Sequence, residues 1–417
     1  MLHAAVDAVH GVTFATGPAV ARRARSRWAG ALTGLLLGAT IGGHSLTAAG
    51  AGTKLQPVSE AVPYPDGRPC ARYRLAAQDQ GVVFRHGQGP NRCDALGARD
   101  VWVWAAAGRY YMHYDGAGPR GWLACLATSP DLAHWTGQGP ALALGKPGQP
   151  DAASASYGVT FQEGRRWHLF YLGTPHVTPP PERVPAFPYL TMKADGPSPT
   201  GPWTKRYDVT PFTPKPGTYY AATASPGQVI KQAGQYLMFF SASTDAPILR
   251  TLGIARTRDL EGPWAIDPAP ILPPTEQVEN TSLYYQAGTG TWFLFTDHVG
   301  LKHGLEYTDA LWVYWTQDLG RWDASRKAIV LDGATSSWSK EIIGLPSVVA
   351  AGRRLAVFYD GYAGPGLPPG VRSHMERDVG LAWLDLPLVI PPALDAPSAG
   401  QGRGSGEPGG GRTPTGP

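Results

Sequence analysis

Hydrophobic and polar positions alternate in short runs over most of the chain, most clearly between residues 279 and 331. Apolar runs at 281–285, 292–296, 310–316 and 328–331 are separated by glycine turns or polar segments. Short runs rich in aromatic and β-branched residues, bounded by turn residues, are typical of β-strands. The stretch is therefore predicted to form a small antiparallel sheet, with a polar loop between its second and third strands.

The same pattern of strand, glycine turn, aromatic strand and further strand recurs along the chain. Its copies begin at Asp100, Tyr157, Thr223, Glu279 and Leu345, at spacings of 57, 66, 56 and 66 residues. One such sheet cannot bury both of its faces, whereas neighbouring copies can cover each other. The predicted fold is all-β, a five-bladed β-propeller of four-stranded antiparallel blades over residues 99–392. A single irregular β-sandwich is the alternative.

The flanking segments differ in composition from the repeats. Four arginines at 22–27, an apolar run at 28–43 and Ala49-Gly50-Ala51 predict a secretory signal over residues 1–51, and an uncleaved membrane anchor is the alternative. We expect an exported protein that is not held at a membrane after cleavage. Residues 52–98 form a lead-in, and the Gly/Ser/Pro-rich residues 393–417 form a disordered tail. The net charge of +4 is mostly in the first segment, so the sequence predicts no nucleic-acid surface.

The chain has three cysteines. Export makes a disulfide between Cys70 and Cys93 in the lead-in plausible, since such bonds form in oxidising compartments. Cys125 stands within an apolar run and is predicted to be buried as a thiol. Three reduced thiols are the alternative, because connectivity cannot be deduced from sequence.

Propeller geometry predicts where the chemistry lies. The first strand of each blade lines the central axis, so the residues that open the first strands converge at one face. Two of them are carboxylates, Asp100 and Glu279. Two carboxylates facing each other across a narrow funnel are what glycoside hydrolysis needs, one as general acid and one as base or nucleophile. The alternative for each is that it caps a loop backbone.

The connections between second and third strands reach the same face and supply candidates for binding. His298 directly follows an apolar strand, and His374 and Arg377 directly precede one, so we expect these three to contact the substrate. Asp309 and Trp102 complete the predicted substrate-binding set. The sequence contains no metal, P-loop or dinucleotide motif, so no cofactor is predicted; a structural ion at the axis is left open, without assigned ligands.

The segment RDVWVWAAAGRYYMHYDG at 99–116, with SPDLAHW, TRDLEGPW and TQDLGRW further on, resembles the five-bladed propeller glycoside hydrolases. The similarity is to the arabinanase and β-xylosidase group, which is related to invertase- and levanase-type enzymes and to mannoside phosphorylases. It implies three acidic residues, an Asp on blade one, an Asp on blade two and a Glu on blade three.

Only the first of these acids has a clear counterpart. Asp100 matches it, although Val101 replaces the usual Pro. Blade two opens at Tyr157 without an Asp, so the nearest candidate is Asp151. Blade three opens at 224–226 without a Glu, and the acid appears on blade four as Glu279.

The sequence thus predicts a secreted, monomeric glycoside hydrolase that acts on an oligo- or polysaccharide and is arabinofuranosidase- or xylosidase-like. Glu279 is the predicted acid, and Asp100 the base or nucleophile. A non-catalytic carbohydrate-binding propeller and a glycoside phosphorylase are the alternatives.

Overall fold

The computed structural model describes residues 52–58, 64–302 and 305–391. The predicted signal segment and the predicted tail lie outside these residues. Within them the chain is almost entirely β-structure, and the helices are three short 3-10 turns, η1 (Pro90–Arg92), η2 (Pro274–Glu276) and η3 (Gly370–His374). None of these helices is long and apolar enough to cross a membrane.

The strands form five successive antiparallel units, each built from neighbouring stretches of chain. The first and second units are made of β4 (Gly97–Ala106), β5 (Arg109–Gly118), β6 (Gly121–Ser129) and β7 (Thr136–Pro140), followed by β8 (Ser154–Glu163), β9 (Arg166–Thr174), β10 (Leu190–Gly196) and β11 (Thr204–Lys205).

The third and fourth units follow the same order. They are made of β12 (Thr223–Ser225), β13 (Val229–Gln232), β14 (Gln235–Ser243), β15 (Arg250–Thr257) and β16 (Ala265–Ile266), followed by β17 (Val278–Gln286), β18 (Thr291–Lys302), β19 (Leu305–Thr316) and β20 (Lys327–Asp332). In the third unit, β12 and β13 both pair with β14 and act as one interrupted strand.

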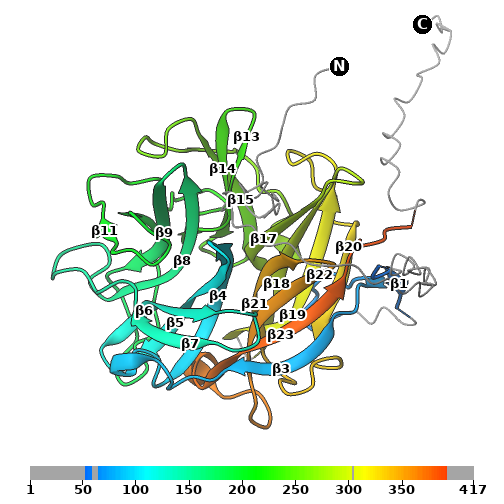
Figure 1. Ribbon diagram of the computed structural model, residues 1–417, viewed down its shortest axis with the longest axis horizontal. Coiled ribbons are helices and arrows are strands. Elements are labelled where there is room, and N and C mark those ends of the chain that lie inside the picture. The colour runs from blue at the N-terminus through cyan, green and yellow to red at the C-terminus, as the bar shows by residue number, and fades with distance from the viewer. Residues whose placement is uncertain (1–51, 59–63, 303–304, 392–417) are drawn as a thin grey trace, which may run out of the picture.

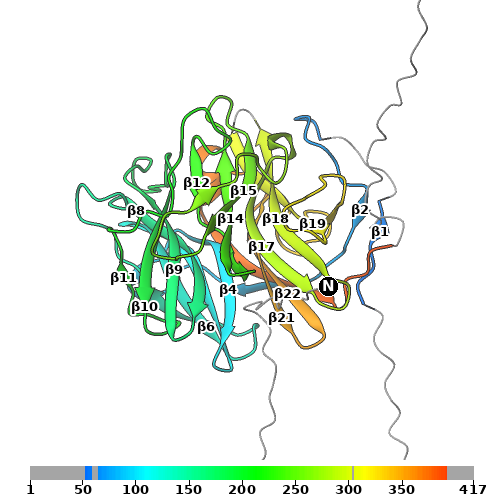
Figure 2. The ribbon, with the colours of Figure 1, turned by 90° about the horizontal axis from the view of Figure 1, so that it is seen from above.

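The fifth unit combines the two ends of the described chain. Strands β21 (Ile343–Ala351), β22 (Arg354–Tyr362) and β23 (Arg377–Asp385) pair in order, and β3 (Gln78–Phe84) from the predicted lead-in pairs with β23. The short strand β2 (Tyr73–Arg74) pairs with β20 at the edge of the fourth unit, and β1 (Gln56–Pro57) pairs with β2; the two short strands lie side by side in Figure 2. The lead-in therefore closes the sheet structure.

The five units follow one another around a common centre (Figure 1). Short parallel contacts between β6 and β8 and between β19 and β21 join neighbouring units near that centre. Each predicted repeat start falls in the first strand of a unit or directly at it, because the apolar runs of the sequence are the strands that the neighbouring units bury.

The segment predicted as a polar loop between the second and third strands of the fourth unit is strand instead. β18 and β19 form one long hairpin that pairs as far as Lys302 and Leu305. Two of its polar side chains, Asp297 and His298, are fully buried and find partners inside the protein. The polar residues of this segment predicted a loop. The strands continue because Asp297 and His298 form buried hydrogen bonds, with Asn280 and Arg68 respectively.

The first strands carry β-bulges at equivalent places, next to the common centre. The register shifts between Arg99 and Trp102 in β4, and at the corresponding positions in β8, β17 and β21. Three bulge residues have positive φ, with 51° at Asp100, 37° at Tyr157 and 60° at Asn280. Bulges re-aim side chains and such backbone strain gathers at functional sites, so these positions point to the centre as the site.

Cys93 and Cys125 are buried thiols whose side chains are hydrogen-bonded to each other. The sequence made a disulfide between Cys70 and Cys93 plausible, but in this structure Cys93 is a thiol, which agrees with the alternative of reduced cysteines. Cys93 follows η1 and Cys125 lies in β6, so the contact between their thiols joins the predicted lead-in to the first unit.

Candidate active site

A pocket with a cavity volume of about 90 Å³ opens where the five units meet. Each unit contributes at least one residue to its wall, among them Asp100, Tyr157, Ser225, Glu279 and Arg377 in chain order. Four of these stand at or next to the interruption in the first strand of their unit. The pocket is therefore built from equivalent positions of the repeated structure.

Asp100 is held at the pocket wall by its backbone and its side chain. Its backbone N–H donates to Asp360 Oδ2 at 3.0 Å, which fixes the bulge. Its Oδ1 accepts from Arg99 Nη2 at 3.0 Å, and Nη1 of the same arginine lies 2.5 Å from His374 Nδ1. This charge-assisted hydrogen bond holds the carboxyl group of Asp100 in place at the pocket wall, a position suited to a base.

Asp115 lies next to Asp100 and is buried. Burial, followed by the charge of Asp100 and a hydrogen bond with its carboxyl group, raises the pKa of Asp115 well above its usual value. Two carboxyl groups in such contact share a proton, since both cannot ionise cheaply. Because burial disfavours the charge on Asp115, the proton belongs on that residue.

Glu279 approaches the pocket from the fourth unit. Its Oε2 lies 3.1 Å from Arg250 Nη1. The same arginine donates two hydrogen bonds to Glu306, from Nε at 2.9 Å and from Nη2 at 2.7 Å. Burial raises the pKa of Glu279; Arg250 opposes the shift, and the charges of Glu306 and Asp100 add to it. Glu279 is thus suited to hold a proton and to donate it.

Two of the predicted binding residues line the pocket. Arg377 is fully buried and bonds Asp360 Oδ1 at 2.6 Å and the carbonyl of Ser373 at 3.0 and 3.1 Å. Burial, followed by the charge of Arg99, holds the pKa of His374 well below its usual value. His374 is therefore neutral, and its Nδ1 accepts from Arg99.

The other three predicted binding residues lie outside the pocket. His298 stacks on Trp312 at a ring distance of 4.0 Å, and Asp309 receives two hydrogen bonds, at 2.8 and 3.2 Å, from Arg68 of the lead-in. Trp102 is buried and donates from Nε1 to Thr160 Oγ1 at 3.0 Å. All three support the packing between elements, because the long β18–β19 hairpin and the bulge in β4 turn them away from the centre.

Asp151 does not line the pocket either. Its carboxylate is fully buried, forms an ion pair with Lys205, and accepts hydrogen bonds from Tyr171 at 2.9 Å and from Tyr207 at 3.1 Å. These contacts hold the loop before β8 against the outer strands of the second unit. We therefore do not retain Asp151 among the proposed catalytic residues.

Sequence reasoning did not single out Arg99, Asp115, Arg250 and Glu306. A signal for Asp115 was present, because aromatic second strands end in Asp at HYDG, FTDH and FYDG, with the acids at 115, 297 and 360. These three acids pair with equivalent first-strand residues in the first, fourth and fifth units. The two arginines carried no such signal, since their contacts are set by packing between units.

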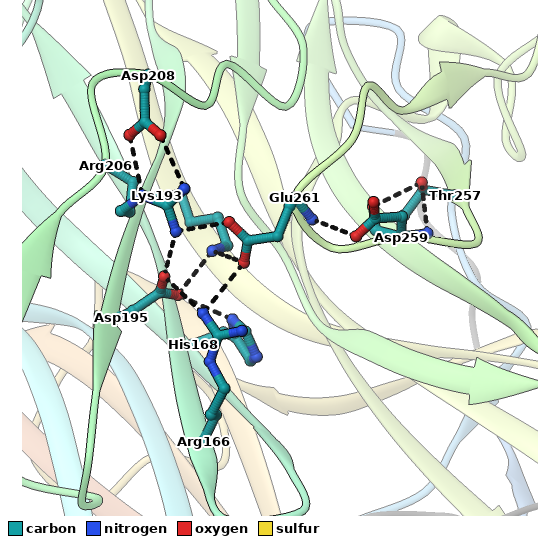
Figure 3. Close-up of polar contacts among 9 residues, drawn as sticks. All are labelled: Arg166, His168, Lys193, Asp195, Arg206, Asp208, Thr257, Asp259 and Glu261. Atoms are coloured by element: carbon teal, nitrogen blue, oxygen red, sulfur yellow. Dashed lines mark hydrogen bonds and ion pairs between the residues drawn. The ribbon is translucent and has the colours of Figure 1, made fainter.

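One group of side chains elsewhere has the spacing of a metal site. Ligand atoms of His168, Asp195 and Glu261 lie within 4.8 Å of one another, in the second unit and the loop after β15. The Nζ of Lys193 lies 2.6 Å from Asp195 Oδ1 and 2.8 Å from Glu261 Oε1, and Arg206 Nη1 lies 2.7 Å from Asp195 Oδ2 (Figure 3). The chain's own cations take the place that a metal would need, so we read the group as an ion-pair network.

No protein-family model and no curated protein matches the sequence. Solved structures do match. The catalytic domain of a GH62 α-L-arabinofuranosidase from Coprinopsis cinerea has a TM-score of 0.53 at 14% identity, over 74% of this chain and 96% of that one. A family 117 glycoside hydrolase from the marine bacterium Zobellia galactanivorans has a TM-score of 0.52 at 16% identity, over 74% and 91%.

An endo-arabinase from Bacteroides thetaiotaomicron has a TM-score of 0.51 at 14% identity, over 72% of this chain and 97% of that one. Each match covers nearly the whole of the other chain, so the shared feature is the complete β-architecture rather than a local motif. The chain has the fold of the propeller glycoside hydrolases, as the resemblance in its sequence predicted.

Proposed function

We propose that the protein is a glycoside hydrolase built on a five-bladed propeller, with each four-stranded unit as one blade. The observation that carries this is the meeting of Asp100 and Glu279 in one pocket with opposite surroundings. A guanidinium bonds the carboxyl group of Asp100, while burial favours the protonated form of Glu279. In glycoside hydrolases, a difference in environment between two carboxyl groups decides which one acts as the acid and which as the base.

In this mechanism Glu279 protonates the leaving oxygen of the glycosidic bond. Asp100 acts on the other side, either by deprotonating the attacking water or by attacking the sugar itself. Asp115, kept protonated, donates a hydrogen bond to Asp100 and so fixes the direction of its free oxygen. Arg250 orients Glu279, and Glu306 holds that arginine in place.

We propose an arabinofuranoside- or xyloside-like substrate at the end of an oligo- or polysaccharide. Two of the structural neighbours are an arabinofuranosidase and an arabinase, which supports this choice. The pocket is small, and Val184 and Pro185 of the loop before β10 stand in its wall beside Trp122. A pocket of this small volume suits a terminal sugar better than the middle of a long chain.

The experiment uses the purified protein and aryl glycosides of arabinofuranose, xylopyranose and galactopyranose. Each sugar is offered with a poor and a good leaving group, p-nitrophenol and 2,4-dinitrophenol. Glu279→Gln should lose about 10²- to 10⁴-fold in kcat on the poor leaving group and much less on the good one, since a good leaving group needs little help from an acid. Asp100→Asn should lose activity on both.

The outcomes separate the candidate functions. Turnover by the wild type with that pattern establishes a hydrolase with Glu279 as the acid. Sugar binding without turnover of any aryl glycoside favours a carbohydrate-binding propeller. This alternative is retained because Tyr157 and Ser225 occupy positions where the resemblance implies acidic residues. Turnover that needs inorganic phosphate would identify a phosphorylase.

We also propose that the protein is exported and acts as a monomer. The support for export is the arginine-led apolar segment at 22–51. Sequencing the N-terminus of protein recovered from the medium and from the membrane fraction of a producing cell tests it. A start near residue 52 supports cleavage, and a start at Met1 in the membrane fraction supports an anchor.

A further inference from the structure

Tyr157 occupies the place in the second unit that Asp100 occupies in the first. It is the bulge residue of β8, with φ of 37°, and its backbone N–H donates to Asp115. Gly158 follows, and a Cβ there would lie 2.5 Å from Leu169 Cδ1. The strand therefore packs closely on its neighbour at this point, and the hydrogen bond to Asp115 holds the bulge that carries the Tyr157 side chain.

The hydroxyl group of Tyr157 is unlike those of other buried tyrosines. Tyr157 lines the pocket yet is only 2% exposed, and its oxygen has no hydrogen-bond partner among the described residues. By contrast, Tyr171 donates to Asp151 at 2.9 Å, and Tyr314 donates to Glu276 at 2.6 Å. A buried hydroxyl without a partner costs free energy, so its presence calls for a compensating role.

The surroundings of this hydroxyl are the proposed reaction centre. Burial raises the pKa of Tyr157 well above its usual value, and the nearby charge of Asp100 adds to the shift. The hydroxyl therefore keeps its proton at any working pH and is a neutral hydrogen-bond donor. Its side chain lines the same pocket as the proposed base, Asp100, and the proposed acid, Glu279.

We propose that Tyr157 binds the sugar directly, its hydroxyl donating a hydrogen bond to an oxygen of the ring held between Asp100 and Glu279. The inference rests on the proposed glycosidase function for its substrate class. The resemblance implies an Asp on this blade, and a carboxylate here would accept a hydrogen bond from a sugar hydroxyl. A neutral donor instead favours a sugar that presents an acceptor oxygen at the pocket floor, which makes Tyr157 a determinant of specificity.

The test compares the wild type with Tyr157→Phe, which removes only the hydroxyl oxygen. Because that oxygen is buried and unpaired in the free protein, the variant should unfold at the same or a higher urea concentration. On the best aryl glycoside its kcat/KM should fall roughly 10- to 100-fold, since a directed hydrogen bond to the substrate is lost. The two effects point in opposite directions, which a purely structural role would not produce.

Tyr171→Phe is the matched control. It also removes one buried hydroxyl, but one that donates to Asp151 away from the pocket. It should lower the urea midpoint and leave kcat/KM at the wild-type value. The proposal is overturned if Tyr157→Phe keeps the wild-type kcat/KM, or if it loses stability as Tyr171→Phe does.

A second readout separates this proposal from the proposed function. Thermal shifts are measured for both proteins with arabinose, xylose and galactose at 50 mM each. If no glycoside is turned over but a sugar raises the Tm of the wild type and not of Tyr157→Phe, the hydrolase proposal fails and Tyr157 remains a binding residue. If a sugar stabilises both proteins equally, or neither, with no turnover, the role of Tyr157 is refuted as well.

Discussion

Asp115 accepts a hydrogen bond at its carboxyl group from the backbone N–H of Tyr157, which joins the first unit to the second at the floor of the pocket. The same relationship recurs between Asp360 and the N–H of Asp100, at 3.0 Å. In both cases the donor is a bulge residue with positive φ, and the acceptor lies at the end of the second strand of the preceding unit.

A bulge removes a backbone N–H from the strand ladder, and a buried N–H needs another acceptor. The fourth unit solves this with a hydroxyl, since Ser241 Oγ accepts from the N–H of Asn280 at 2.8 Å. The strained backbone around the pocket is thus held from unit to unit. The buried acids of the second strands therefore stabilise the bulges, whether or not they also take part in the chemistry.

Asp115 tests this relationship. Asp115→Ala leaves the N–H of Tyr157 without an acceptor and should lower the free energy of unfolding by about 1–3 kcal/mol. Asp115→Asn keeps an acceptor oxygen and should lose much less. Urea unfolding of both variants measures the difference, with Asp208→Ala on the exposed surface as the control. Equal losses for Asn and Ala would show that the hydrogen bond does not hold the bulge.

Much of the architecture could be predicted from the sequence, because the repeated apolar runs are the strands that the units bury between them. The pairing of β3 with β23 could not, since residues 78–84 carry no clear apolar pattern and their partner lies about 300 residues away. The β18–β19 hairpin was mispredicted as a loop for a related reason. Its polar residues find buried partners, as when Asn280 Nδ2 donates to Asp297 at 3.0 Å.

The residues of the candidate site also fall into those that the sequence indicated and those that it did not. Asp100 and Glu279 could be found because they open first strands, and this position alone brings them to the centre. Arg99 and Arg250 could not, because their partners come from packing between units. His298 and Asp309 were placed at the rim by their sequence position, but the long hairpin carries them to the contact with Arg68 of the lead-in.

Asp151 and Asp100 should respond differently to the same change. Asp151→Asn weakens a buried ion pair with Lys205 and should cost about 1.5–3 kcal/mol of stability, with kcat/KM unchanged. Asp100→Asn should remove activity. The two variants are compared by urea unfolding and by turnover of one aryl glycoside. A loss of kcat/KM in Asp151→Asn at full folding would return this residue to the catalytic set.

Arg250 should set the alkaline limit of activity. Its charge opposes the raised pKa of Glu279, so Arg250→Met should raise that pKa further. The basic limb of kcat/KM should then move up by about 1–3 pH units, although the maximum rate falls because Glu279 is less well oriented. Arg250→Lys keeps the charge and should leave the limb close to the wild-type position. An unmoved limb in Arg250→Met would mean that Glu279 is not the acid.

His374 should make stability depend on pH. Burial, followed by the charge of Arg99, holds its pKa well below the value of about 6.5 that it has in the unfolded chain. Below that pH the unfolded chain binds a proton that the folded protein does not, so the stability from a neutral His374 is present above pH 6.5 and lost as the pH falls. The loss approaches about 1.4 kcal/mol per pH unit.

His374→Gln removes this titration while leaving an oxygen that can accept from Arg99. Urea unfolding of both proteins between pH 7.5 and 4.5 should therefore show a smaller fall in stability for the variant than for the wild type. The other buried histidines contribute equally to both curves and cancel in the difference. Parallel curves would mean that His374 carries its proton in the folded state, and its Nδ1 could then not accept the hydrogen bond that positions Arg99 against Asp100.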